Sequence, residues 1–306
     1  MNKIAILTDS CCDLPKETIK ELGINVLPFT LTIGGESFRE IYDKSTKEFY
    51  ELLETTDEIP KHSQISPITF EETYKELFEK GYTDIISVSI NSKGSGTFNN
   101  SVLAKNDFYE NNPEAEGKMR IYNIDSKCYT LFYGYPVMEA AKKIRRGAEP
   151  EEIVAYLEDW FNVSAIYAVP FTLKYAKKSG RISAAKAFAG ELLGLKPVIM
   201  FADGNTETVD KIRGEKNIVS KLVEIVEKNM TPQTPYIMLH GKDDTVAKEV
   251  EKELAKKTGR KAEMFGSIGA VVTANIGPDL VAVVVRRKNI IERTPFEKGA
   301  SLKLSP

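Results

Sequence analysis

Histidine, cysteine and tryptophan are scarce in this sequence, which limits the chemistry that it can carry out. Its 306 residues include two histidines, three cysteines and one tryptophan. Cys11, Cys12 and Cys128 are an odd set with one adjacent pair, so they have neither the pattern of a disulfide framework nor the ligand spacing of a zinc site. We therefore expect reduced thiols, no bound metal and a cytoplasmic protein.

The chain also lacks an excess of charge of one sign and any long apolar run. A net charge of -2 gives no electrostatic basis for binding nucleic acid, and no apolar run approaches the length of a membrane span. The opening Met-Asn-Lys-Ile-Ala-Ile-Leu-Thr-Asp has too short an apolar run for a signal peptide and predicts a first strand. With 42% hydrophobic and 28% charged residues, the chain is long enough for two globular domains.

Strands and helices alternate through the first half of the chain. A helix should begin at Asp13-Leu14-Pro15, where an N-cap precedes a proline, and a hydroxyl-rich loop is expected over 59–67. The hydrophobic periods predict strands at 4–7, 24–33, 84–90 and 119–124, and helices at 46–53, 68–80, 135–146 and 150–161. This order is typical of a mostly parallel sheet with flanking helices, so we predict an α/β domain over 1–162.

The second half has a different pattern. Strands are expected at 166–169, 197–201, 209–212, 236–239 and 281–286, with a hairpin turn at Asp203-Gly204-Asn205. Few long helical connections separate some of these strands. We therefore predict an α+β domain over 163–306 with a mixed or antiparallel sheet. Its last part, 290–306, has little periodicity and could lie over the surface.

The stretch from residue 84 to 105 is the most informative part of the sequence. A β-branched strand is followed by the turn Asn91 to Gly96, and a helix begins near Ser95 or Thr97, either of which could cap it. Glycines at 94 and 96 could adopt positive φ or let a ligand approach the backbone. Such a helix start can bind an anion through its N–H groups and the two hydroxyls. The alternative is an ordinary capped turn between a strand and a helix.

Three strands end in small polar or acidic residues, namely Thr8-Asp9-Ser10, Asn91-Ser92 and Asp125-Ser126. Ligands bind at the carboxyl ends of strands in open parallel sheets, so these ends favour a site at that edge. The same residues could instead cap the helices that follow.

Catalytic motifs are largely missing. There is no P-loop and no dinucleotide fingerprint, and we expect no cofactor. A serine hydrolase that uses Ser95 as nucleophile and His62 as base remains an alternative function. However, Lys93-Gly94-Ser95-Gly96 differs from the Gly-x-Ser-x-Gly nucleophile elbow. The other histidine, His240, follows a predicted strand and has no evident catalytic partner.

Short motifs in a fixed order resemble those of the DegV family. The first are Thr8-Asp9-Ser10 and Asp13-Leu14-Pro15. The others are Ser63-Gln64, Ser66-Pro67, Ser95-Gly96-Thr97, Asp125-Ser126, Leu173 with Gly180-Arg181-Ile182, Leu195-Lys196-Pro197, and Gly277-Pro278. Each motif is weak, but the ordered set is specific and covers nearly the whole chain.

The resemblance implies a function. Such a protein is similar to the fatty-acid-binding subunit of bacterial fatty acid kinase, and its two domains enclose a long acyl chain. A separate fatty acid kinase catalytic subunit would phosphorylate the carboxylate, so this chain would not be an enzyme alone. The resemblance implies ligand binding by His62, Ser63, Ser95, Gly96, Thr97, Asn275 and Gly277, and partner contact by Lys178 and Arg181. Segments 187–195 and 264–268 are candidate tunnel walls, although core packing explains them equally well.

Four positions depart from the family pattern. His62 stands where the family usually has threonine, and Asn275 stands where it has histidine. Ser179 and Asp279 replace glycines, and Asp279 could either oppose a bound carboxylate or point to solvent. These changes concern the head-group pocket more than the fold. We expect that His62 replaces the missing histidine from the opposite wall of the pocket.

Overall fold

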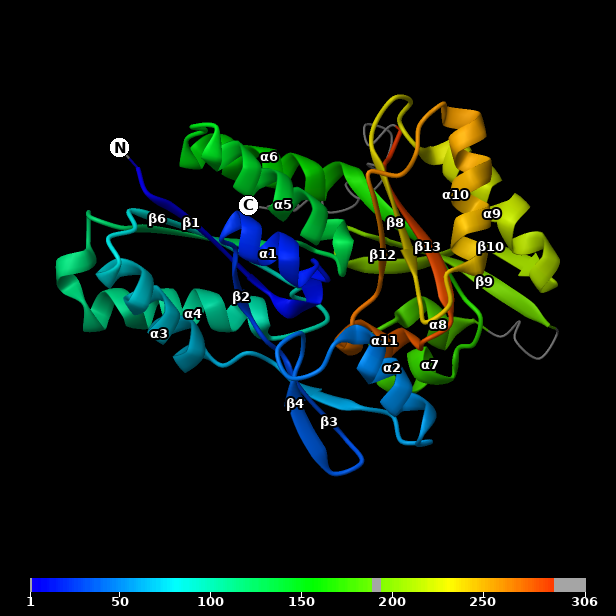
Figure 1. Cartoon of the computed structure of the whole chain (residues 1–306), viewed down its shortest axis with the longest axis horizontal. Helices are drawn as coiled ribbons and strands as arrows, with labels where there is room; N and C mark the ends of the chain where they lie inside the picture. Colours follow the sequence, from blue (N-terminus) through cyan, green and yellow to red (C-terminus); the bar gives the residue numbers. More distant parts are fainter. Residues whose placement is uncertain (1, 189–193, 289–306) are drawn as a thin grey trace, which may run out of the picture.

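The strands of the described residues form three sheets. The computed structural model describes residues 2–188 and 194–288, and it contains one four-stranded, one six-stranded and one three-stranded sheet. Figure 1 shows the four-stranded sheet beside the six-stranded sheet, with helix α11 where the two halves meet. Within the described residues, no helix is both long and apolar enough to cross a membrane.

The four-stranded sheet is parallel throughout, with the strand order β2-β1-β6-β7. Its strands are β1 (Ile4–Asp9), β2 (Asn25–Leu27), β6 (Asp84–Ser89) and β7 (Arg120–Asp125). Helices α3 (Pro67–Glu79) and α4 (Thr97–Asn111) cover one face, and α5 (Leu131–Arg145) and α6 (Pro150–Val163) cover the other (Figure 1). Helix α1 (Lys16–Leu22) packs beside α5. The predicted parallel sheet with flanking helices is confirmed.

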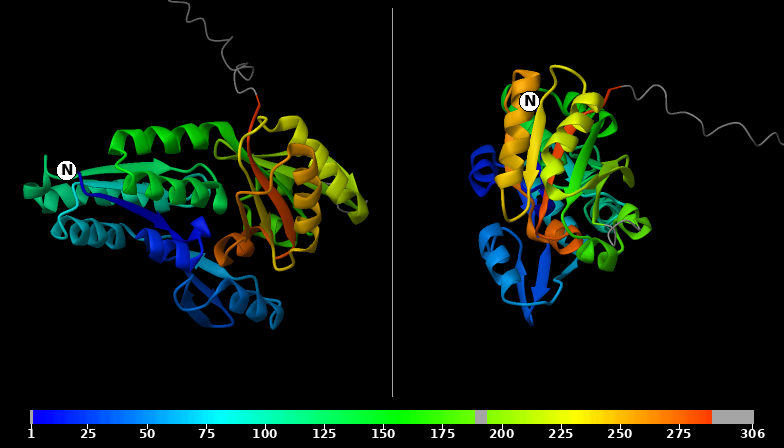
Figure 2. Two further views of the ribbon diagram at one scale, coloured as in Figure 1. Left: turned by 45° about the horizontal axis from the view of Figure 1, so that its top comes forward. Right: turned by 90° about the vertical axis from the view of Figure 1, so that its right-hand side faces the viewer.

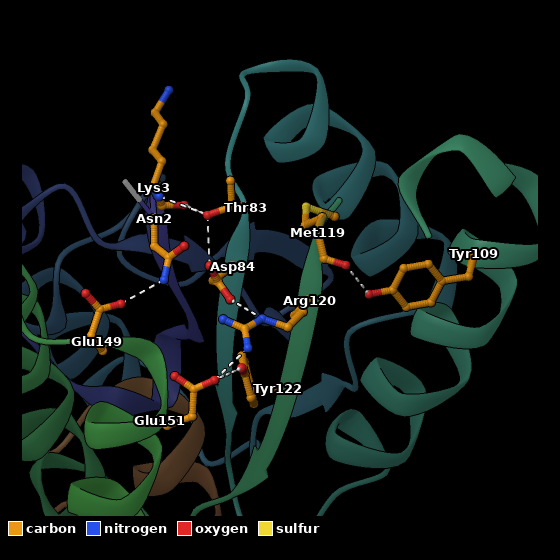
Figure 3. Close-up of polar contacts among 10 residues, drawn as sticks. All are labelled: Asn2, Lys3, Thr83, Asp84, Tyr109, Met119, Arg120, Tyr122, Glu149 and Glu151. Atoms are coloured by element: carbon orange, nitrogen blue, oxygen red, sulfur yellow. Dashed lines mark hydrogen bonds and ion pairs between the residues drawn. The ribbon is translucent and has the colours of Figure 1, made fainter. Parts of the chain in front are cut away.

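An ion-pair network fixes the amino-terminal edge of this sheet (Figure 3). Asp84 at the start of β6 is almost fully buried, and Arg120 at the start of β7 donates to it through Nε at 2.8 Å. The Nη1 atom of Arg120 also donates to Glu151 at 2.6 Å. Because a buried carboxylate is costly without a partner, this pairing fixes the register of β6 against β7. The opposite, carboxyl-terminal edge is left to form the site.

The six-stranded sheet is mostly antiparallel, with the order β10-β9-β8-β13-β11-β12 and a parallel pair only at β11 and β12. Its strands are β8 (Ser164–Pro170), β9 (Leu195–Ala202), β10 (Asn205–Arg213), β11 (Tyr236–His240), β12 (Met264–Ser267) and β13 (Leu280–Arg286). One face packs on α9 (Ile218–Asn229) and α10 (Thr245–Thr258), and the other joins the core of the N-terminal half (Figure 2). The mixed sheet and its hairpin between β9 and β10 are confirmed.

The remaining elements lie around the junction of these two sheets. They are helices α2 (Thr46–Glu54), α7 (Lys174–Ser179), α8 (Ser183–Ala187) and α11 (Ala270–Ile276), with a short 3-10 turn at Ser10–Cys12. Two further 3-10 turns lie elsewhere: Pro113–Ala115 precedes β7, and Glu215–Asn217 precedes α9. Helix α6 ends at Val163, next to the boundary expected at 162, and the division into domains stays a prediction. The expected tail over 290–306 lies outside the described residues.

Two local predictions are wrong. The segment 24–33 is not one strand, because Pro28 has no N–H to continue a ladder, and the chain changes sheets there. Strand β3 (Thr30–Ile33) pairs antiparallel with β4 (Glu36–Arg39) and with β5 (Lys61–Ser63), which forms inside the expected loop 59–67. This third sheet carries His62.

Asp13 also behaves differently from the prediction. It does not cap α1, whose N-cap is Pro15 without a side-chain hydrogen bond. Instead Asp13 has φ of 54° and its Oδ2 accepts a hydrogen bond from the backbone N–H of Gly269 at 2.9 Å. Its carboxyl group therefore joins the N-terminal half to the start of α11, far along the chain.

Candidate functional site

A narrow apolar cavity lies where the carboxyl-terminal edge of the parallel sheet meets the six-stranded sheet and α11. Its empty volume is about 670 Å³, part of which is open to solvent. Apolar residues supply most of the lining, among them Phe29, Ile90, Ile166, Phe201, Leu239 and Ile276. The side chains at the lining that carry polar groups are His62, Ser95, Tyr129, Thr130, Arg181 and Asn275.

His62 and Asn275 meet directly at this cavity, although 213 residues separate them. The amide nitrogen of Asn275 lies 3.0 Å from His62 Nε2 and 2.7 Å from the carbonyl oxygen of Val271. Because the carbonyl accepts, this atom of Asn275 must be the donor, so Nε2 of His62 is the acceptor. The proton of the neutral ring is then on Nδ1, a buried atom without a partner among the described residues. Burial and the charge of Arg181 lower the pKa of His62.

Ser95 lies at the cavity just before α4. The N-cap of α4 is Gly96 and makes no side-chain hydrogen bond, so the expectation that Ser95 or Thr97 caps this helix is wrong. Ser95 Oγ instead accepts from the N–H of Thr97 at 3.3 Å and lies 3.0 Å from Thr97 Oγ1. Thr97 is fully buried, and its hydroxyl accepts from the N–H of Ile65 at 3.3 Å. These hydrogen bonds from the buried Thr97 thus hold Ser95 in position.

The two glycines beside Ser95 are required for their small size. Neither has positive φ, so the expectation of left-handed glycines at 94 and 96 is wrong. A Cβ atom at Gly96 would be 2.2 Å from Gln64 Oε1, and one at Gly94 would be 2.4 Å from the hydroxyl of Tyr129. Both glycines are therefore approached closely by protein side chains, and the approach of a ligand to them stays a prediction.

Arg181 adds a positive charge to the same region. Its Nε donates to the carbonyl oxygen of Gly94 at 3.2 Å, next to Ser95. Ser179, two residues earlier, donates from Oγ to the carbonyl oxygen of Asn275 at 3.2 Å. The loop after α7 is thereby attached to both sides of the polar end of the cavity. Lys178 is exposed and does not line it.

The other predicted residues lie close by without lining the cavity. Ser63 is exposed on β5, and Gly277 ends α11 with φ of 100° beside Tyr175. Asp279 is not at the cavity, and its carbonyl oxygen accepts from the N–H of Phe171. Of the expected wall 264–268, only Ile268 lines the space, and most of the wall 187–195 lies outside the described residues.

The polar strand ends mainly hold loops in place. Asp9 accepts from the hydroxyl of Tyr133 at 2.5 Å and from the N–H groups of Ile90 and Cys11 at 2.8 and 3.1 Å. Ser92 donates to Asp125. These contacts order the segments that carry Ile90 and Ser95 to the cavity.

Two carboxyl groups, from the buried Glu40 and the partly buried Asp13, hold the start of α11. Glu40 accepts from Ser10 Oγ at 2.5 Å and from the N–H of Val271 at 2.9 Å, while Asp13 accepts from Gly269. A Cβ at Gly269 would be 2.3 Å from an Asp13 oxygen and 2.8 Å from a Glu40 oxygen, so only glycine fits there. Desolvation raises the pKa of both carboxyl groups, and the charge of Glu40 raises that of Asp13 further.

The geometry does not assemble a hydrolase from Ser95 and His62. The recorded hydrogen bonds of Ser95 Oγ go to Thr97, and that of His62 goes to Asn275. The nucleophile, base and orienting acid of such an enzyme need to be hydrogen-bonded in sequence. The arrangement is suited instead to holding a polar group among several donors.

Several lining residues could not be found from the sequence. Phe29 follows the proline inside a segment that reads as one strand, and Ile166 and Phe201 look like ordinary core residues. Thr130 precedes α5 and carries no motif. Only the alternating burial of β8 and β9, which assigns one face of each strand to the N-terminal half, places Ile166 and Phe201 at the cavity.

Fold and site together define an α/β protein with an apolar cavity that ends in hydrogen-bond donors. The family model described as "Uncharacterised protein, DegV family" matches residues 3–288. The chain belongs to the DegV family. A DegV domain-containing protein of Caldanaerobacter subterraneus is 30% identical over 94% of this chain and 100% of that protein.

Solved structures of the same family resemble the whole chain. A fatty acid binding DegV family protein from Streptococcus agalactiae has a TM-score of 0.81 and 27% identity, covering 94% of this chain and 100% of its own. A DegV family protein from Thermus thermophilus, described by its fatty acid binding, has a TM-score of 0.80 and 26% identity, covering 92% and 98%. The predicted family is confirmed.

Proposed function

We propose that this protein binds one long-chain fatty acid in the cavity, with the carboxylate at the group formed by His62, Ser95, Arg181 and Asn275. The observation that carries the proposal is an apolar cavity with its donors gathered beside α11. Each methylene buried from water contributes about 0.8 kcal/mol, so a long acyl chain favours an enclosed space. The carboxylate needs donors because an unpaired charge out of water is costly.

The donor and acceptor roles in the hydrogen bonds around the cavity leave donors free for that carboxylate. Thr97 can donate both its N–H and its hydroxyl to Ser95, because its own oxygen accepts from Ile65. The hydroxyl proton of Ser95 is then available to a ligand. The Nδ1–H of neutral His62 is also unused, and Arg181 supplies positive charge. The solved relatives that are described as fatty acid binding support a fatty acid as the ligand.

The first prediction tests the ligand and Ser95. Protein purified from a bacterial host should release a fatty acid in roughly equimolar amount on denaturing extraction and mass spectrometry. Ser95→Ala removes one hydrogen bond to a charged group and should weaken affinity by about 1.5–3 kcal/mol. Ser183→Ala, which removes an exposed hydroxyl outside the cavity, is the matched control. Protein that carries no lipid and shows no thermal shift with added fatty acids would contradict the proposal.

We further propose that the bound carboxylate is presented to a fatty acid kinase catalytic subunit in the cytoplasm, and that this chain is not catalytic alone. Lys178 is exposed on α7, and Arg181 spans from the same surface to the cavity through Gly94. Arginine binds phosphate through two parallel hydrogen bonds, so Arg181 is placed to contact the phosphoryl group as it reaches the carboxylate. The cysteines are buried and free, which agrees with a reducing compartment.

A second prediction separates partner contact from ligand binding. Lys178→Glu should leave fatty-acid affinity unchanged and slow acyl phosphate formation by about tenfold, because charges at the rim of an interface mainly affect association. Lys228→Glu makes the same charge change on the outer helix α9 and should have no effect. Arg181→Ala should abolish acyl phosphate formation with the kinase and also lower fatty-acid affinity, because Arg181 belongs to the proposed carboxylate group. Equal kinase turnover of the Lys178→Glu and Lys228→Glu proteins would place the contact elsewhere.

A further inference from the structure

Thr130 is an unusual residue at the cavity. It is 3% exposed, it lines the cavity, and its Oγ1 has no hydrogen-bond partner among the described residues. Buried hydroxyl groups in proteins nearly always have a partner, because leaving one unpaired is destabilising. A partner for this hydroxyl is therefore expected from whatever occupies the cavity.

The backbone of Thr130 supports the same conclusion. Its φ of 60° and ψ of -150° lie in a region that is almost confined to glycine, and a β-branched residue is strained there. A threonine that precedes a helix normally uses its hydroxyl as an N-cap, but Thr130 makes no such bond. The first turn of α5 is closed by its carbonyl oxygen, which accepts from Tyr133 and Gly134 at 3.2 and 3.1 Å. In this strained backbone conformation the hydroxyl does not cap the helix.

Thr130 is separate from the proposed head-group site. His62 is bonded to Asn275, and Arg181 is bonded to the carbonyl of Gly94 beside Ser95. Among the described residues, no hydrogen bond connects the hydroxyl of Thr130 to any of these groups. It comes from the loop after β7, whereas they come from β5, α11 and the segments next to α4 and α7. Thr130 is consequently a polar point of the cavity apart from the head-group residues, which a plain fatty acid leaves without a partner.

We propose that Thr130 is a specificity-determining residue for an acyl chain that carries an oxygen, as a hydroxyl or oxo group, along its length. The inference rests on the proposed fatty-acid binding. Oγ1 can donate to either group and can also accept from a hydroxyl, so both ligand types complete its hydrogen bonding. Because Thr130 is fixed at one depth in the cavity, a single position of the oxygen on the chain is favoured.

The test compares stearic acid with a series of hydroxystearic acid isomers, in competition with a fluorescent fatty acid on delipidated protein. The wild-type protein should bind one isomer about tenfold more tightly than stearic acid, as expected for pairing a buried hydroxyl. Thr130→Val keeps the β-branched shape and removes the hydroxyl. This variant should lose the preference while binding stearic acid at least as well as before. Ser95→Ala should weaken both ligands equally and keep the preference.

Three outcomes would overturn the inference. Equal binding of stearic acid and every isomer by the wild type would mean that a water molecule satisfies Thr130. A preference that survives in Thr130→Val would assign it to another residue. Loss of stearic acid binding in Thr130→Val, with none in Ser95→Ala, would place the carboxylate at Thr130. Failure of the proposed function itself is distinct, since no fatty acid would then bind to any variant.

Discussion

The free energy of unfolding should fall as the pH rises from about 4 to about 8. Burial raises the pKa of Asp9 to about 7, and it also raises the pKa values of Asp13 and Glu40. Between the unfolded and folded pKa values, the folded protein holds protons that the unfolded chain has released. Stability is therefore complete below the unfolded values and is lost as the pH approaches the folded ones. The slope should be about 1.4 kcal/mol per pH unit for each such proton.

One substitution isolates the carboxyl pair at the start of α11. Asp13→Asn keeps an oxygen to accept from the N–H of Gly269 and removes a carboxyl group whose charge repels that of Glu40. Asparagine also tolerates the left-handed backbone at this position. The variant should be more stable than the wild type at pH 8, and its pH slope should be smaller by about one proton. Urea unfolding at a series of pH values measures both quantities.

Asp43 is the matched control for that experiment. It is exposed, and its hydrogen bonds with Arg39 lower its pKa to about 2. Between pH 5 and pH 8, the stability of Asp43→Asn should depend on pH as that of the wild type does. The carboxylate of Asp43 is ionised in both the folded and the unfolded protein over this range. If Asp13→Asn loses stability at pH 8 as well as at pH 5, the pair is ionised and held by contacts that the amide cannot replace.

The parallel sheet and Ser95 could be predicted because their signals are local. The β-branched run 84–90 and the turn after it define β6 and the segment that carries Ser95 to the cavity. The pattern of β1 and β7 is of the same kind. Ligand binding at the carboxyl ends of such strands is a general property of open parallel sheets, so the location of the site also followed.

The walls of the site depend on pairings that no local pattern encodes. Strand β5 has a sequence, Lys61–Ser63, with little strand preference, and it forms because β3 provides a partner for it. Asp13 looks like a helix cap, and its role at Gly269 arises from contacts 256 residues apart. Thr130 has a positive φ that no local pattern in the sequence signals. Tertiary contacts of this type override local preference.

The meeting of His62 with Asn275 leads to the prediction with the largest effect on ligand binding. The ring comes from β5 and the amide from α11, on facing sides of the polar end. His62→Thr should weaken fatty-acid affinity by about tenfold to a hundredfold, because a shorter, neutral hydroxyl replaces an imidazole that can be protonated beside the carboxylate. Adding Asn275→His to that variant returns an imidazole from the opposite wall and should restore binding. Each affinity is measured by competition with a fluorescent fatty acid.

The pH dependence of binding identifies the imidazole as the group responsible. In the ligand-free protein, burial and the charge of Arg181 hold the pKa of His62 below its ordinary value. A bound carboxylate favours the protonated ring, so the pKa is higher in the complex. Affinity should be complete below the free value and should fall as the pH rises through the bound value, while the ligand stays ionised. His62→Gln keeps a neutral donor, so it should bind without this dependence. If His62→Thr binds as tightly as the wild type at every pH, His62 does not contact the ligand. If the double variant binds no better than His62→Thr, an imidazole at position 275 cannot replace the one at position 62.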